Sequence, residues 1–124
     1  MKYSLLIFLL ILFSCNQQKQ NISDCSEIKT PFKSYSEAKN TVKSVDFKFT
    51  DKVDTSKSSW IRSAKYYSCD GNAGYLVYTT DKKEYIHQDV PIRVWEEFKN
   101  ADSFGKYYNK NIKKRYRLVP QNDE

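Results

Sequence analysis

Two clusters of turn-forming residues divide the middle of the chain into three aromatic-rich runs. Residues 69–74 have the sequence CDGNAG, in which glycine supplies positive φ at little steric cost, and residues 81–83 are DKK. The flanking runs at 60–67, 75–80 and 84–88 are rich in tyrosine and β-branched residues, which is typical of strands. Three strands joined by two tight turns predict an antiparallel meander.

The spacing of apolar residues changes from a strand period to a helix period at Pro91. Proline is tolerated in the first turn of a helix, because the N–H that it lacks would have no partner there. Val94, Trp95, Phe98 and Ala101 then fall on one helical stripe. This pattern predicts a helix that begins near Pro91.

Further elements are expected on either side of these runs. Ser34 and Glu37 have the spacing of a capping box, which predicts a helix at 35–44. Another helix is predicted at 103–115. The remaining predicted elements are a short strand at 45–49, a loop at 51–58 and a short last strand at 117–119.

Strands followed by helices predict an α+β fold. We expect a small antiparallel three-stranded meander followed by two helices packed on one face, preceded by a short helix–strand extension. A chain of 124 residues accommodates one small domain with appendages. The expected divisions are a lipoprotein signal peptide at 1–14, a tether and extension at 15–54, the main domain at 55–119 and an acidic tail at 120–124.

The amino-terminal residues have the pattern of an export signal. Lys2 precedes an unbroken apolar run at 5–13, about half the ~20 residues that a membrane-spanning helix needs. The following Ser14 and Cys15 resemble the lipobox of bacterial lipoproteins, whose cysteine is acylated when the signal peptide is removed. We therefore expect a lipoprotein of the cell envelope, held in the outer membrane by acyl chains such as palmitate on Cys15. An ordinary signal peptide or an uncleaved anchor is the alternative.

The content of glycine, cysteine and histidine limits the chemistry of the chain. Three glycines leave little material for a nucleotide-binding loop, and one histidine with three cysteines is poorly suited to a four-ligand zinc site. No cofactor and no metal are therefore expected. In an exported chain, Cys25 and Cys69 are expected to form a disulfide. Two free thiols are the alternative, and a catalytic dyad of Cys69 with His87 is a remoter one.

Nine residues between the first strand of the meander and the end of the last helix have the spacings of a known sequence motif. Its members are Ser59, Tyr85, Val90, Pro91, Ser103, Gly105, Asn109, Ile112 and Tyr116. The stretch from Ser58 to Tyr116 resembles the KTSC domain, a short module named for its occurrence at the carboxyl terminus of some lysyl-tRNA synthetases. The family often has an aromatic residue where this chain has His87. Fusion to a synthetase implies contact with nucleic acid or another polyanion.

Positive charge is concentrated toward the carboxyl end. Residues 55–119 contain 13 basic and 7 acidic residues. The predicted last helix carries its basic residues opposite its apolar side, and they are Lys106, Lys110, Lys113, Lys114 and Arg117. Such a stripe can contact nucleic-acid phosphates or anionic lipid headgroups. The alternative is a solvated face that only keeps the protein soluble.

Several single residues have expected structural roles. Trp60 and Trp95 are expected to anchor the core, and Asn109 to make a structural hydrogen bond. His87 is expected on a partly solvated strand face, and Asp89 as the cap of the following helix.

These features favour a binding protein over an enzyme, and no catalytic residue is expected. The leading hypothesis is a membrane-anchored KTSC-like binding or adaptor module that presents a basic helix to a polyanion or an acidic partner. One alternative is an envelope lipoprotein of phage defence, immunity or assembly that binds an unidentified protein. A small hydrolase using Ser58 or Ser59, His87 and Asp89 is a remote alternative, because no motif joins these residues.

Overall fold

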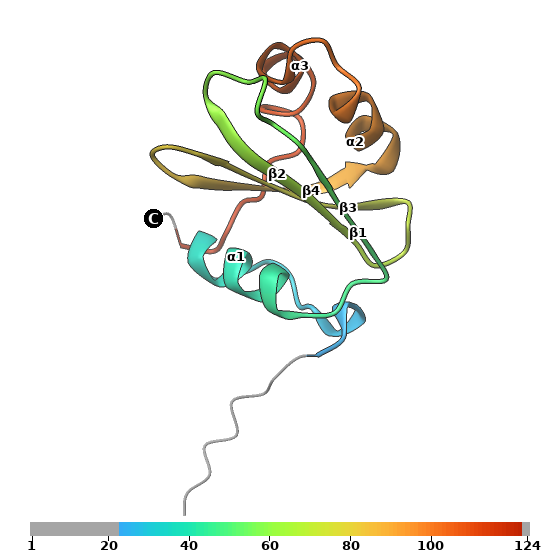
Figure 1. Ribbon diagram of the computed structural model, residues 1–124. Coiled ribbons are helices and arrows are strands. Elements are labelled where there is room, and N and C mark those ends of the chain that lie inside the picture. Colours follow the sequence, from blue (N-terminus) through green and yellow to red (C-terminus); the bar gives the residue numbers. More distant parts are fainter. Residues whose placement is uncertain (1–22, 123–124) are drawn as a thin grey trace, which may run out of the picture.

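The computed structural model describes residues 23–122 and shows a sheet with helices on both sides (Figure 1). Among these residues, no helix has the length and apolar character needed to cross a membrane. The predicted signal peptide at 1–14 and the predicted lipidation site, Cys15, lie outside the described residues. The elements in chain order are η1 (Cys25–Glu27), α1 (Tyr35–Ser44), β1 (Phe49–Val53), β2 (Ile61–Ser68), β3 (Ala73–Thr80), β4 (Glu84–Pro91), α2 (Ile92–Lys99) and α3 (Phe104–Asn111).

The sheet is antiparallel and has four strands in the order β1-β2-β3-β4. The predicted three-stranded meander with two helices is therefore wrong, because β1 adds a strand and α1 adds a helix to the same body. β1 pairs with β2 from Phe49 opposite Ser68 to Val53 opposite Ala64. Most of β1 lies in the stretch that was expected to be a loop at 51–58.

A polar residue hides β1 from sequence patterning. Phe49, Asp51 and Val53 are the half-buried positions of this strand, so a carboxylate occupies the centre of its inner face. The indole Nε1 of Trp95 donates to Asp51 Oδ2 at 2.9 Å, and Lys99 Nζ lies 2.6 Å from the same oxygen. These partners satisfy the carboxylate and join β1 to α2.

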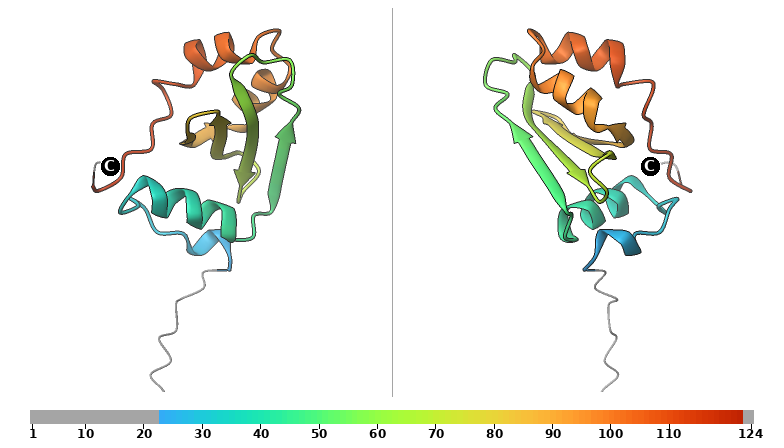
Figure 2. Two further views of the ribbon diagram at one scale, coloured as in Figure 1. Left: turned by 60° about the vertical axis from the view of Figure 1, so that its left-hand side comes forward. Right: turned by 90° about the vertical axis from the view of Figure 1, so that its right-hand side faces the viewer.

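Helices cover both faces of the sheet, whereas the sequence predicted helices on one face. Helices α2 and α3 pack on one face and α1 packs on the other (Figures 1 and 2). The reason is visible in β3, where Leu76 and Tyr78 belong to the core under α2 and α3, while Val77 belongs to the core under α1. A strand that is apolar on both faces needs a layer of helices on each.

The helices α1 and α2 begin in different ways. Helix α1 has the predicted bounds, and Ser34 Oγ accepts from the backbone N–H of Glu37 at 3.1 Å. Helix α2 has Pro91 at its N-cap and no side-chain cap, so the expected capping role of Asp89 is wrong. Asp89 instead has φ 56° and lies in a bulge of β4, between the pairs Gly74–Val90 and Leu76–His87.

Helix α3 is shorter than predicted. Ser103 Oγ caps it by accepting from the N–H of Lys106, but the helix ends at Asn111 rather than at residue 115. The N–H groups of Ile112 and Lys113 both donate to the carbonyl of Tyr108, which tightens the last turn. Beyond it, an isolated bridge between His87 and Arg117 replaces the strand expected at 117–119.

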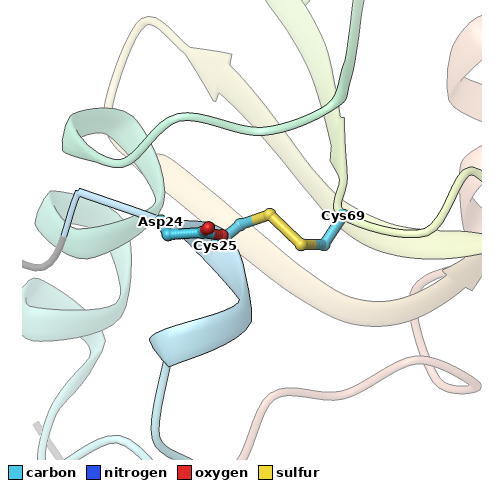
Figure 3. A group of neighbouring side chains, drawn as sticks. All are labelled: Asp24, Cys25 and Cys69. Carbon is cyan, nitrogen blue, oxygen red and sulfur yellow. A yellow bond between two sulfur atoms is a disulfide. The ribbon is translucent and has the colours of Figure 1, made fainter.

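Cys25 and Cys69 form the predicted disulfide, with Cα atoms 5.8 Å apart (Figure 3). The alternatives of free thiols and of a Cys69–His87 dyad are therefore wrong. The bridge ties η1 to the end of β2 across 44 positions of sequence, a span worth about 4 kcal/mol in the chain-entropy model. Asp24 lies beside both sulfurs, but its carboxylate accepts from the N–H of Ser26 and the sulfurs are bonded to each other. Cys25 and Cys69 are thus a structural disulfide and Asp24 caps η1, so this group is not a set of metal ligands.

Candidate functional site

A large groove runs past the turn between β3 and β4. Its volume is about 1160 Å³, and α1, the residues before β2, the β3–β4 hairpin and the segment after α3 all contribute to it. In Figure 1 that last segment descends from α3 along the edge of β4 toward α1. We call this feature the Trp60 groove, and residues that line it include Tyr35, Trp60, Lys83, Tyr85, Lys113 and Arg117.

The floor of the Trp60 groove is a row of parallel rings. Tyr78 on β3 lies between two residues of β4, because side chains at alternate positions share one face of the sheet. Its ring stacks on Tyr85 with centroids 4.8 Å apart and on His87 with centroids 5.9 Å apart. Trp60 meets Tyr78 and Tyr108 edge-on, at 6.3 and 6.1 Å.

A hydrogen-bond chain fixes these rings from below. Tyr78 OH donates to Tyr108 OH at 2.6 Å, and Tyr108 OH lies 2.9 Å from His87 Nε2. His87 Nδ1 lies 3.1 Å from the carbonyl oxygen of Tyr116, which can only accept. We therefore assign the proton to Nδ1, so that Nε2 accepts from Tyr108 OH. The hydroxyl groups of Tyr78 and Tyr108 then each donate one hydrogen bond.

The buried environment favours the neutral forms of His87, Tyr78 and Tyr108. Burial lowers the pKa of His87 below its ordinary value, although its bond to the Tyr116 carbonyl opposes the shift. Burial raises the pKa of Tyr78, helped by its bond to Tyr108, and burial also raises the pKa of Tyr108. His87 is only 6% exposed, so the expectation of a partly solvated face is wrong.

The residues of the hydrolase alternative do not come together. Both ring nitrogens of His87 are taken by Tyr108 and Tyr116. Ser58 Oγ instead accepts from the backbone N–H groups of Trp60 and Ile61. This arrangement favours a positioning role for His87 over that of a base acting on serine.

The rim of the Trp60 groove is positively charged. Lys82, Lys83, Lys113 and Arg117 line it, and none of them forms an ion pair within residues 23–122. Lys83 Nζ lies 4.9 Å from the centroid of the Tyr85 ring. The two carboxylates of the groove are neutralised from outside it, since Asp81 pairs with Arg62 at 2.7 Å and Glu84 pairs with Lys43 at 2.8 Å.

The predicted basic helix is not a single surface. Lys106 and Lys110 lie on α3, whereas Lys113, Lys114 and Arg117 come after its end. The buried C-cap, Ile112, turns the chain at this point so that Tyr116 reaches His87. Only Lys113 and Arg117 of the five line the Trp60 groove.

The motif residues of the last helix now have structural roles. Ser103 caps α3, Ile112 is fully buried at its end, and Tyr116 supplies the carbonyl for His87. A side chain at Gly105 would put its Cβ 2.6 to 2.9 Å from the indole of Trp60, so only glycine lets this ring lie against α3. Asn109 is exposed and lines the groove without a structural hydrogen bond within residues 23–122, contrary to expectation.

The other motif residues belong to the strands. Tyr85 is part of the ring row, Val90 is fully buried, and Pro91 ends β4. The carbonyl of Ser59 accepts from Arg62 just before β2 begins.

These roles fall in the segment that the family comparison identifies. Residues 57–116 match the KTSC domain family. The KTSC segment extends from just before β2 to Tyr116 and holds the ring row, the Trp60 indole and Gly105. No match is found among curated proteins or among solved structures.

Residues on both sides of the KTSC segment complete the Trp60 groove. Among residues 23–122 the exposed large hydrophobic side chains are Tyr35, Trp60 and Val119, which are 36%, 37% and 64% exposed. All three line this one groove. Tyr35 precedes the KTSC segment and Val119 follows it, so family resemblance alone gave no signal for either.

Trp60, like His87 and Asn109, is a groove residue whose environment differs from the expectation. It was expected in the core, and only Trp95 is fully buried. The available signal was Gly105, because a glycine inside the first turn of a helix marks a close approach by another group.

Proposed function

We propose that the protein is a non-enzymatic binding module that holds a polyanion in the Trp60 groove. The observation that carries the proposal is the coincidence, in one groove, of every exposed large hydrophobic side chain of residues 23–122 with four exposed cations that form no ion pair among these residues. Apolar patches rimmed by polar groups mark interaction sites. The unpaired cations favour an anionic partner.

The proposal includes an anchor in the cell envelope. The apolar run at 5–13 followed by Cys15 supports export and acylation, and the disulfide agrees with an oxidising compartment. Intact-mass measurement of the native protein is expected to give a chain that begins at Cys15 and carries acyl mass. An unmodified chain that retains Met1 would contradict this part.

The binding test compares two double charge reversals. Lys113→Glu with Arg117→Glu changes the groove, whereas Lys52→Glu with Lys65→Glu makes the same change in net charge elsewhere. Lys52 and Lys65 are exposed and lie opposite each other on β1 and β2, outside the Trp60 groove. The probes are labelled linear polyphosphate and a labelled short oligothymidylate, followed by fluorescence anisotropy.

We expect the wild-type protein to bind at least one probe, with affinity falling roughly fifty-fold between about 50 and 200 mM salt if four cations contact phosphate. The groove reversal is expected to weaken binding at least tenfold and to reduce the salt dependence, and the control reversal to have little effect. Equal losses in the two variants would indicate general charge attraction. Absence of binding to either probe at low salt would overturn the proposal.

An acidic protein partner is a second candidate, supported by the exposure of Val119 and Tyr35 at the end of the groove nearest α1. Protein partners use such side chains as anchors. Co-purification from membranes with the wild-type protein, but not with the groove reversal, would support it.

A further inference from the structure

The Trp60 groove offers aromatic rings as well as charge. Of the aromatic side chains in residues 23–122, Tyr35 and Trp60 are the most exposed, and both line this groove. They come from opposite sides of the sheet, since Tyr35 begins α1 and Trp60 precedes β2 beside α3. A ligand that uses both rings must therefore be extended.

Trp60 is held in place while part of its ring stays open. Tyr78 and Tyr108 contact it edge-on, and the backbone of α3 at Gly105 lies against it. Its indole N–H has no acceptor among residues 23–122, whereas the corresponding group of Trp95 donates to Asp51. A fixed ring that is 37% exposed is suited to stacking on a planar group.

Cations lie along the same groove as the two rings. Lys83, Lys113 and Arg117 line it without carboxylate partners in the described chain. The volume of about 1160 Å³ exceeds the 300–1,000 Å³ typical of small-molecule pockets. Two exposed rings from opposite sides of the sheet, together with three cations in a groove of this volume, match a chain of several nucleotides better than a single one.

We infer that the polyanion of the Trp60 groove is single-stranded nucleic acid, with bases on Trp60 and Tyr35 and phosphates on Lys83, Lys113 and Arg117. This inference rests on the proposed function and names its ligand. Stacking of this kind is tolerant of sequence, because every base has a π-face. Paired bases inside a duplex cannot reach separate rings, so the duplex is excluded by the geometry of stacking.

The test separates the bases from the phosphates. Short oligothymidylate is compared with an abasic oligodeoxynucleotide of the same length, with the matching duplex and with vesicles rich in phosphatidylglycerol. Binding is followed by anisotropy of the labelled strands, by vesicle sedimentation and by quenching of tryptophan fluorescence. Quenching reports on Trp60, because Trp95 is fully buried.

Oligothymidylate is expected to bind about 5- to 150-fold more tightly than the abasic strand, the range that corresponds to stacking of one base. Trp60→Ala is expected to reduce oligothymidylate binding toward the abasic value and to leave abasic binding unchanged, and Trp60→Phe to restore part of the difference. Thermal melting tests whether both variants are folded. If they are not, Tyr35→Ala, which changes an exposed residue, is compared with the wild-type protein for binding to oligothymidylate and to the abasic strand.

Equal affinity for the abasic strand and oligothymidylate would overturn the inference and leave a phosphate-binding groove, as proposed above. Preference for the duplex or for the vesicles over oligothymidylate would also overturn it. Failure of every probe, polyphosphate included, would instead remove the proposed function itself.

Discussion

The two tryptophans of the chain lie in regions that differ in almost every physical respect. Trp95 is fully buried, stacks on Tyr66 at 5.3 Å and donates its indole N–H to Asp51 at 2.9 Å. Trp60 is 37% exposed, rests on the backbone of Gly105 and has no acceptor for its N–H among residues 23–122. The Trp95 ring contacts only other parts of the protein, whereas part of the Trp60 ring is exposed and can contact a ligand.

This difference separates stabilisation from recognition. The Trp95 region joins β1 to α2 through Asp51 and Lys99, and removal of any member takes one hydrogen-bond or ion-pair partner from a partly buried group. The Trp60 region contains unpaired cations and an open ring, which contribute little to folding. Changes in the first region should therefore act on stability, and changes in the second on binding.

The largest expected effect comes from truncating the two rings. Trp95→Ala should lower the free energy of unfolding by about 3–5 kcal/mol, since it leaves a cavity and removes the donor to Asp51. Trp60→Ala should cost roughly 1 kcal/mol, because its ring is partly solvated and its N–H makes no hydrogen bond within residues 23–122. Urea denaturation of both variants measures the difference. Losses of equal size would show that the two regions are not distinct.

A smaller effect is expected from pH, and the two regions should respond in different ranges. The Lys99 ammonium lowers the pKa of Asp51 below 3.8, so the stability from this carboxylate is present above that pH and is lost in stronger acid. Burial lowers the pKa of His87 below 6.5, so the unfolded chain binds a proton that the folded chain does not. Stability should therefore fall as the pH drops below about 6.5, with a slope of at most about 1.4 kcal/mol per pH unit.

His87→Gln isolates the second response, since His87 is the single histidine of the chain. Glutamine can still hydrogen-bond to Tyr108, and the variant should lose the decline in melting temperature between pH 7 and 5. It should keep the decline below pH 4. An unchanged profile between pH 7 and 5 would assign that response to other groups.

The smallest effect on stability, with a clear effect on the groove, is expected for Gly105→Ala. The new methyl group must displace the Trp60 indole, whereas alanine favours a helix over glycine by about 1 kcal/mol, so the net change in stability should stay within about 1 kcal/mol. The displaced ring should become more accessible to acrylamide. Lys106→Ala, an exposed change in the same turn, should leave the quenching unchanged; a similar rise in both variants would contradict the support that Gly105 gives to Trp60.

Much of the fold could be predicted from local chemistry, and the errors share one cause. The N-cap at Ser34, the turns on either side of β3 and the bridge from Cys25 to Cys69 depend on a few residues each, and all were predicted. A strand was predicted here at 45–49, but β1 extends over Phe49–Val53, because the partner that makes Asp51 acceptable inside a strand is Trp95, which lies 44 positions away. Periodicity cannot detect a tertiary hydrogen bond.

The candidate site was harder to predict for the same reason. Charge counting found Lys113 and Arg117 but assigned them to a helix that ends before them. The exposure of Trp60 and the burial of His87 depend on how α3 crosses the sheet, and neither residue carries that information in its neighbours. The glycine at position 105 was the one local clue, and it was noted only as part of a motif.

The disposition of β1 has a consequence for where this protein can be divided. The KTSC segment begins at residue 57, after β1 has ended. A polypeptide that began at residue 57 would expose the hydrogen-bonding edge of β2. It would also lack Cys25, the disulfide partner of Cys69, and Asp51, the hydrogen-bond acceptor of the Trp95 indole. In this chain, β1 covers the edge of β2. Without it, other molecules could pair with that edge and the protein would aggregate.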